Sequence, residues 1–458
     1  MATRSKNQSH QGTVSMPIIN AHAGGIDVSS TFHAVAVNQD KSSYAEFGVT
    51  TPDLHDLCQH LQSHGVTSIA LESTSYYWIP LFWMLQSYGI EAIVINPSDL
   101  KRFNKPKNDR DDAMWLQQLH TLGLLKPSFQ LDNFSEALRG YGRRRRTLIQ
   151  EISRQLNRMH KVLVLMNVQI GTQLTHLNSV SGLAIIADIV KGERDPKVLI
   201  EHIQKGVKTP KSELLKALQG TWQPQYVFEL KQLWANYGLL QAQLDECDKA
   251  IEEELLKYCA DKGITPPDPM DKPTHTERKL KGSQNSPTLT IVRSIKALSG
   301  VDCLDIGGVG GAFVLDVAAE LGFDLHQFPT HKHFTSWLGL APNKRTSGGK
   351  TLSSKIPKKQ NHAARAFRQA ANAIGNCKEH PLKPFFCAIL KRQGRRGAIV
   401  ATARKLAVIY YNMLTKQLPF DYQGRQIDPD KYKAAQIKKI KKSIKELNID
   451  LSELTVAA

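Results

Sequence analysis

Residues 105–119, which read KPKNDRDDAMWLQQL, gather carboxylates at the start of a predicted helix. Asp109, Asp111 and Asp112 stand among lysines and an arginine, and apolar residues follow at helical spacing. Two explanations are open. Acidic side chains favour a helix N-terminus because they meet the positive end of the helix dipole. Carboxylates arranged in this way can also hold a divalent metal ion against a phosphate group.

Two further carboxylates stand at the ends of predicted strands. Asp27 lies in GGIDVSS, and Glu72 ends the apolar stretch SIALE. Asp109 and Asp112 are three residues apart and share one helix face, whereas Asp111 points elsewhere. Taken singly, each acid is better explained as a turn or cap residue. Together they can converge at one edge of a sheet, where carboxylate oxygens suit Mg²⁺ or Mn²⁺.

The elements that must position these acids occupy residues 18–130. Three consecutive strands are predicted over AGGIDVSS, FHAVAVNQ and SYAEFGVTT. A helix that ends at Gly65, the strand VTSIALEST, a helix that ends at Gly89 and the strand IEAIVINP follow. Three strands and then alternating helices and strands predict an α/β sheet layered by helices, in a ribonuclease-H-like order.

The rest of the chain divides by composition. Two long amphipathic stretches with heptad-like apolar spacing predict an antiparallel helical arm or coiled coil. A proline-rich linker separates this arm from a mostly helical block. The predicted segments are a loose tail (1–17), the α/β domain (18–130), the arm (131–262), the linker (263–288), the helical block (289–418) and a basic amphipathic helix (419–458).

The net charge narrows the choice of partner. The 458 residues include 60 Lys and Arg against 42 Asp and Glu, a formal net charge of +18. Such an excess favours a polyanion, most often nucleic acid, over an anionic membrane surface. No stretch reaches the roughly 18 apolar residues of a membrane span, and the N-terminus lacks the apolar core of a signal peptide. We therefore expect a cytoplasmic, nucleoid-associated protein that does not bind membranes.

The cysteines argue against two other classes. The six cysteines are scattered, and no two of them have the C-x-x-C spacing. This pattern disfavours a structural zinc site and a secreted disulfide framework.

A basic run on the predicted arm is a candidate nucleic-acid surface. Residues 143–146 are four consecutive arginines, followed by Arg154 and Arg158 on the same helix. Such a run is often only a solvated face, but the overall positive charge favours contacts with phosphates. Lys107, beside the aspartates, is expected to make a similar contact.

A serine in the helical block has a suggestive setting. Ser347 lies in RTSGGK, where two glycines allow a sharp turn and a close approach to a ligand. No His-Asp pair is visible to activate it as in a protease, and a flexible basic loop with an incidental serine remains an alternative. The cations that could bind phosphates here are Lys344, Arg345, Lys350 and Lys355.

Upstream of this serine, residues 300–312 read GVDCLDIGGVGGA. They resemble a helix-hairpin-helix-like turn that presents backbone N–H groups to DNA phosphates. Tight helix packing explains the glycines equally well.

The motifs GIDVSS, ALESTSYYW, VINPSDLKRF and KNDRDDA resemble those of the DEDD insertion-sequence transposases. These are the insertion-sequence family 110 and its relatives, which include the pilin-gene inverting recombinases. The resemblance covers nearly the whole chain, since residues 298–350 and the later RAFRQAANAI and ARKLAVIYYNML are similar to the family's second domain.

The resemblance implies a RuvC-like first domain in which Asp27, Glu72, Asp109 and Asp112 bind divalent metal. It also implies that Ser347 attacks DNA and becomes covalently joined to it, with Ser353 and Ser354 as fallback candidates.

Three positions depart from the family pattern. Ser30 stands where a lysine is frequent, Ser75 where a glycine is frequent, and Gln360 precedes Asn361 where a glycine is frequent. None of these removes a carboxylate, so the differences concern local backbone geometry.

Family members work with a noncoding RNA that pairs with donor and target DNA, and they assemble as tetramers built from two dimers. We therefore expect an RNA-guided DNA transposase, a recombinase that is a homo-oligomer. Two alternatives stay open. One is a metal-dependent nuclease that resolves branched DNA such as Holliday junctions, in which Ser347 is idle. The other is a non-catalytic nucleic-acid-binding protein.

Overall fold

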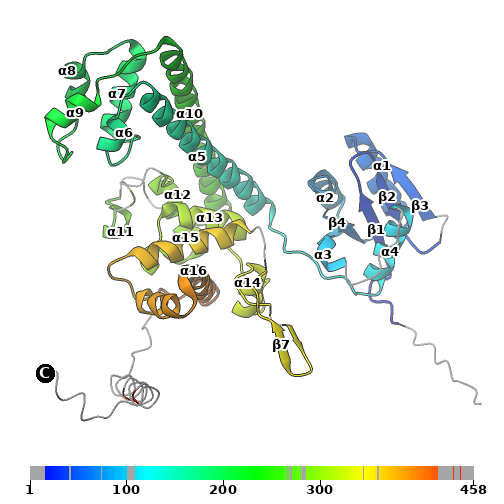
Figure 1. The fold of residues 1–458 in the computed structure, drawn as a ribbon. Helices are drawn as coiled ribbons and strands as arrows, with labels where there is room; N and C mark the ends of the chain where they lie inside the picture. The colour runs from blue at the N-terminus through cyan, green and yellow to red at the C-terminus, as the bar shows by residue number, and fades with distance from the viewer. Residues whose placement is uncertain are drawn as a thin grey trace, which may run out of the picture. The chain divides into compact units, whose positions relative to one another are not determined.

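The computed structural model describes most of the chain, in two compact units, Met1–Gln130 and Leu131–Ala458 (Figure 1). The described residues are 16–40, 43–73, 75–100, 109–265, 268, 271–278, 280, 285–343, 345–357, 361–420, 437 and 444. Of residues 98, 99, 109, 110, 275 and 345 only the backbone is described.

The first unit is built on a mixed five-stranded sheet with the strand order β3-β2-β1-β4-β5. Strand β1 pairs antiparallel with β2 and parallel with β4; β2–β3 is antiparallel and β4–β5 is parallel. This is the ribonuclease-H-like pattern, so the predicted order of three consecutive strands followed by alternating helices and strands is confirmed. The strands are β1 (Ala23–Val28), β2 (His33–Ala36), β3 (Tyr44–Phe47), β4 (Ser68–Glu72) and β5 (Glu91–Ile95).

Helices cover both faces of this sheet. Helices α1 (Thr51–Ser63) and α2 (Trp78–Ser87) pack on one face, against a core that includes Ile26 and Leu71. Helix α4 (Asp109–Thr121) lies on the other face, and the short helix α3 (Pro97–Leu100) precedes it in the chain. Because side chains alternate along a strand, the residues next to those core positions point towards α4.

Gly25 lets α4 lie unusually close to β1. A Cβ atom at this position would stand 2.4 Å from the carbonyl oxygen of Ala113 and 2.4 Å from the backbone nitrogen of Gln117. Only glycine fits such an approach. The C-terminal end of α4 lies at the start of β1, because the side-chain amide nitrogen (Nε2) of Gln117 donates to the carbonyl oxygen of Ala23. The N-terminal end of α4, with its aspartates, is therefore directed towards the end of β1.

The second unit is dominated by two long helices, α5 (Asn133–Leu165) and α10 (Pro224–Asp261), which lie side by side (Figure 1). They run antiparallel, since Arg145 of α5 pairs with Asp248 while Tyr258 near the end of α10 bonds to Asp132 before α5. Small helices lie between them in the chain: α6 (Ile170–Gln173), α7 (Val180–Lys191), α8 (Pro196–Leu199), η2 (Ile200–His202) and α9 (Lys211–Ala217).

The helical block packs against this arm within the same unit. It is almost entirely helical, apart from one hairpin, and the last long helix bends at Gly394, whose φ is 71°. Its elements are α12 (Leu289–Ser299), η4 (Cys303–Ile306), α13 (Gly311–Leu321), α14 (His331–Trp337), β6 (Arg345–Ser347), β7 (Lys350–Ser353), α15 (His362–Asn376) and α16 (Lys383–Lys416).

The described part of the expected linker at 263–288 contains a short helix. Helix α11 (His275–Arg278) lies in it, and buried Glu277 pairs with Arg293 of α12 at 3.0 Å. The tail at 1–17 and the basic helix at 419–458 lie almost wholly outside the described residues. None of the helices that the structure describes combines the length and the apolar character that a membrane crossing needs.

Candidate active site

Asp27 and Glu72 stand next to each other on the α4 face of the sheet. Ile26 and Leu71 are register partners in the parallel β1–β4 pair, so the residues that follow them lie at the same level. Both acids are at the carboxyl ends of their strands, where side chains of neighbouring parallel strands meet at one edge. Asp27 is half-buried and Glu72 is buried.

Helix α4 brings its aspartates towards the same end of this face. Asp112, which precedes Ala113 at the close contact with Gly25, is 7% exposed. Asp111 is exposed, which confirms that it faces away from Asp112. The side chain of Asp109 lies outside the described part of the chain, although its backbone begins the helix.

The donor chemistry fits a divalent cation. Asp27, Glu72 and Asp112 supply carboxylate oxygens from three elements on one face, and hard oxygen ligands of this kind bind Mg²⁺ or Mn²⁺. Among the described side chains, no three His, Cys, Asp or Glu lie close enough to form a complete metal-binding group, and this set does not include Asp109. A metal site formed by Asp27, Glu72, Asp109 and Asp112 therefore stays a prediction.

Ser347 lies at the tip of a hairpin that projects from the second unit (Figure 1). It pairs across the hairpin with Lys350, and only Gly348 and Gly349 separate the two strands. Both glycines have positive φ, 54° and 75°, as the tightest hairpin turns require. The two glycines therefore explain the sharp turn. Ser347 itself is exposed, so its hydroxyl is accessible to solvent.

The basic residues expected around Ser347 are partly described. Lys350 and Lys355 are exposed on the hairpin and its stem. Lys344, the side chain of Arg345, Gln360 and also Lys107 of the first unit lie outside the described residues. Of the fallback serines, Ser353 is half-buried and Ser354 is exposed.

Two family models match this chain. Residues 24–168 match the model of the DEDD transposases of the IS110 type, described as "Transposase", and residues 303–385 match "Transposase IS116/IS110/IS902 family". The first match contains the four carboxylates and the second contains Ser347.

The chain belongs to the IS110 family of transposases.

Two curated relatives agree with this assignment. The chain is 34% identical over 120 residues to the "Transposase for insertion sequence element IS1111A" of Coxiella burnetii, a match that covers 24% of this chain and 32% of that protein. It is 30% identical over 118 residues to the "Probable family 20 transposase" of Pseudomonas aeruginosa, covering 25% of this chain and 35% of that protein. The match thus spans about a third of each relative's length. Membership of this DEDD family implies the use of a divalent metal.

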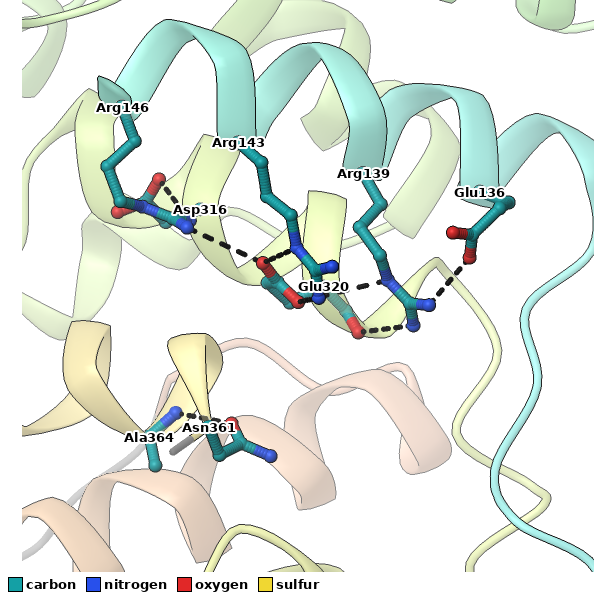
Figure 2. A network of polar contacts seen from close by, with 8 residues as sticks. All are labelled: Glu136, Arg139, Arg143, Arg146, Asp316, Glu320, Asn361 and Ala364. Carbon is teal, nitrogen blue, oxygen red and sulfur yellow. Dashed lines mark hydrogen bonds and ion pairs between the residues drawn. The ribbon is translucent and has the colours of Figure 1, made fainter. Parts of the chain in front are cut away.

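Most arginines of the run at 143–146 form ion pairs with carboxylates of the same chain, and Figure 2 shows those of Arg143 and Arg146. Nε and Nη2 of Arg143 donate to the two carboxylate oxygens of Glu320 on α13, at 3.0 and 2.8 Å. Arg146 pairs with Asp316 at 3.0 Å and with Glu320 at 3.5 Å. Arg139, one turn earlier, also pairs with Glu320. These ion pairs join α5 to α13.

Arg145 is buried rather than presented to a ligand. It is 4% exposed, and its guanidinium donates to both oxygens of Asp248 on α10, at 2.5 and 3.1 Å. The interpretation of residues 143–146 as one phosphate-binding face is therefore corrected for Arg145, because its guanidinium is not accessible. Arg143 and Arg146 also have partners within the chain. The exposed members of the predicted set are Arg143, which is paired with Glu320, and Arg144, Arg154 and Arg158.

The glycine-rich segment at 300–312 shows close packing at two positions. A Cβ atom on Gly308 would stand 2.9 Å from Ile374 of α15, and one on Gly311 would stand 2.6 Å from the hydroxyl of Ser286. Packing therefore accounts for these two glycines. Gly310, which precedes α13, has open space beside it.

The segment after Glu72 has an unusual backbone conformation and carries an exposed aromatic ring. Ser75, which stands where the family often has glycine, has a φ of 52°, a left-handed conformation that glycine adopts more easily. The next residue, Tyr76, is 65% exposed. The available signal was a pair of tyrosines four and five residues after the strand-end Glu72.

Proposed function

We propose that this protein is a DNA transposase that cuts and rejoins DNA by phosphoryl transfer at a metal-dependent carboxylate site. The observation that carries the proposal is the placement of Asp27 beside Glu72, with the aspartate-bearing helix α4 packed across the same sheet face. The two family matches, which cover this sheet and the serine hairpin, support it.

In this proposal Asp27, Glu72, Asp109 and Asp112 hold Mg²⁺ or Mn²⁺. A divalent cation bound there supplies Lewis-acid charge that a reacting phosphodiester requires. The protein's own contribution is orientation: Gly25 lets α4 approach the sheet, and the strands fix the level of the two strand-end acids.

Ser347 is proposed as the nucleophile. Its Oγ forms a bond to phosphorus while a phosphorus–oxygen bond of the DNA backbone breaks, and the released deoxyribose oxygen takes up a proton as the serine hydroxyl loses one. The exposed position beside Gly348 gives the hydroxyl access to a phosphodiester. Lys350, directly across the hairpin, can neutralise phosphate charge. The phosphoserine link conserves the bond energy for rejoining.

The proposed partners are donor and target DNA, a noncoding guide RNA and further copies of the chain. With an RNA guide, base pairing would select the DNA sequence, while the protein would recognise the shape and the phosphates of the nucleic acids. Among the cations predicted to bind nucleic acid, Arg144, Arg154 and Arg158 on the arm and Lys350 and Lys355 on the hairpin are exposed and can contact phosphates.

Trapping of a covalent intermediate tests the proposal. The full chain is incubated with Mg²⁺, RNA transcribed from the element's noncoding flank, and nicked DNA of the element's joined ends. We expect a protein–DNA adduct on a denaturing gel, mapped to Ser347 by mass spectrometry and lost in Ser347→Ala. Ser353→Ala and Ser354→Ala are matched controls and should retain it.

Two results would contradict this mechanism. Efficient cleavage without any adduct would favour a nuclease, in which water attacks the phosphate. An adduct mapped to Ser353, Ser354 or a tyrosine would move the nucleophile away from Ser347.

A further inference from the structure

The first unit carries an exposed aromatic ring close to the carboxylate end of its sheet. Tyr76 follows Glu72, the last residue of β4, by four residues. A chain of four residues spans at most about 14 Å, and successive nucleotides of a stacked strand rise about 3.4 Å. Tyr76 therefore lies within a few nucleotides of any phosphate held by the carboxylates.

The ring of Tyr76 lies beside aromatic residues that are themselves packed against the core. Tyr76 and Tyr77 have their ring centroids 4.7 Å apart with an interplanar angle of 46°. Tyr77 and Trp78 are partly buried and pack against the core beneath α1 and α2. Tyr76 nevertheless keeps 65% of its surface exposed, so the support occupies only part of the ring.

The backbone that carries the ring is held at both ends. The amide and the hydroxyl of Ser73 both donate to the carbonyl oxygen of Ile95, at 3.0 and 3.1 Å, which ties the segment to β5. On the other side, the indole N–H of Trp78 donates to the carbonyl oxygen of Ser75 at 3.2 Å. These bonds hold the backbone on either side of Tyr76, so little backbone conformational entropy is lost when a ligand stacks on its ring.

We propose that Tyr76 is a stacking platform for an unpaired nucleobase of the DNA strand that enters the carboxylate site. A fixed, exposed aromatic face beside a phosphate-binding site matches the way in which proteins hold single-stranded nucleic acid. Stacking tolerates any base, because every base has a π-face. This inference rests on the proposed function, since that function brings a DNA strand to Glu72.

Binding to single-stranded DNA in EDTA tests the platform without any cleavage. The probes are mixed-sequence oligonucleotides that carry 2-aminopurine, plus a series in which one position at a time is abasic. For the full chain we expect one abasic position to weaken binding by about 5- to 150-fold. Tyr76→Ala should weaken binding of the intact oligonucleotide by a similar factor and should be insensitive to that abasic position.

Two variants serve as controls. Tyr76→Phe keeps the aromatic face and should bind as the parent does. Phe228→Ala removes a ring of α10 that is 64% exposed, nearly the same fraction as Tyr76, and should also leave binding unchanged.

The proposed stacking is wrong if Tyr76→Ala binds the intact oligonucleotide as tightly as the parent does. It is also wrong if the same abasic position weakens the binding of Tyr76→Ala and of the parent equally. Tighter, Tyr76-dependent binding of RNA than of DNA would overturn the choice of DNA. A change in oligomeric mass without a change in binding would identify a protein contact instead. Failure of the transposase proposal looks different: cleavage would be absent in Mg²⁺ while the coupling between Tyr76 and one base persists in EDTA.

Discussion

Asp111 and Asp112 are neighbours in the chain with opposite surroundings. Asp111 is exposed, whereas Asp112 is buried where α4 approaches Gly25 of β1. The dipole of α4 favours both residues equally, so it does not explain why one of them is buried. In this buried position, a cation shared with Asp27 and Glu72, as we propose, would favour the ionised form of Asp112.

This difference gives a matched pair of variants. We expect Asp112→Asn to lower DNA cleavage in Mg²⁺ by at least about 100-fold, because it removes a charged metal ligand. Asp111→Asn removes the same charge one residue away and should leave the cleavage rate nearly unchanged. Mn²⁺ should raise the thermal stability of the parent and of Asp111→Asn but not that of Asp112→Asn. Equal cleavage by the two variants would remove Asp112 from the site.

The ion pairs between α5 and α13 give the arginine run a structural role. Glu320 is buried on α13 and accepts from Arg143 while Arg139 and Arg146 lie nearby (Figure 2). Burial alone would raise the pKa of Glu320, but the hydrogen bonds and charge of Arg143, with the charge of Arg139, outweigh it and lower the pKa. The ionised form of Glu320 therefore stabilises the folded second unit.

Glu320→Gln should destabilise the second unit by about 1–3 kcal/mol. The estimate is below the full cost of breaking a buried ion pair, because the side chain of Arg143 is 49% exposed and solvent screens it. Denaturant-dependent hydrogen exchange of the α5 and α13 amides in the full chain measures the loss. Arg144→Gln is the control, because Arg144 is exposed and makes a solvent-exposed hydrogen bond to Gln243. Equal exchange in the two variants would contradict a stabilising role for Glu320.

The difference in stability between the parent and Glu320→Gln should depend on pH, and the lowered pKa of Glu320 gives the direction. A carboxyl group with a lowered pKa in the folded state stabilises the fold above its unfolded pKa, about 4.3 for glutamate. That contribution is lost as the pH falls through the folded pKa. The stability gap between the parent and Glu320→Gln should therefore narrow as the pH is lowered from 7 to below 4.

In the whole molecule, the carboxylates and the serine hairpin belong to different compact units. Phosphoryl transfer by Ser347 at the metal site would therefore require residues of both units to meet at one phosphate. We propose that the meeting occurs between subunits of an oligomer, so that one copy supplies the carboxylates and another supplies the serine.

Mixing two inactive variants tests this arrangement. Asp112→Asn retains the serine and Ser347→Ala retains the carboxylates, so a mixed oligomer can assemble one complete site. We expect each variant alone to be inactive and the mixture to recover part of the recombination activity. Strand joining measured with guide RNA and both DNA partners gives the readout. A mixture that stays inactive although the two chains co-purify would mean that each site is built within one copy.

The sequence alone was sufficient for the order of elements in the first unit. Alternating apolar residues and the glycines at 65 and 89 predicted the strands and helices in their observed order. These signals are local, since they depend on residues a few positions apart. The resemblance to the family rested on short motifs of the same kind, and the two family matches confirm it.

The partners of charged and aromatic side chains could not be derived in this way. Arg143 is 177 residues from Glu320 and Arg145 is 103 residues from Asp248, so nothing near the arginine run reveals that three of its members are ion-paired with distant carboxylates. The support beneath Tyr76 likewise depends on how β4, β5 and α2 pack together. Local periodicity determines which elements form, whereas packing between distant segments decides which side chains remain available for a ligand.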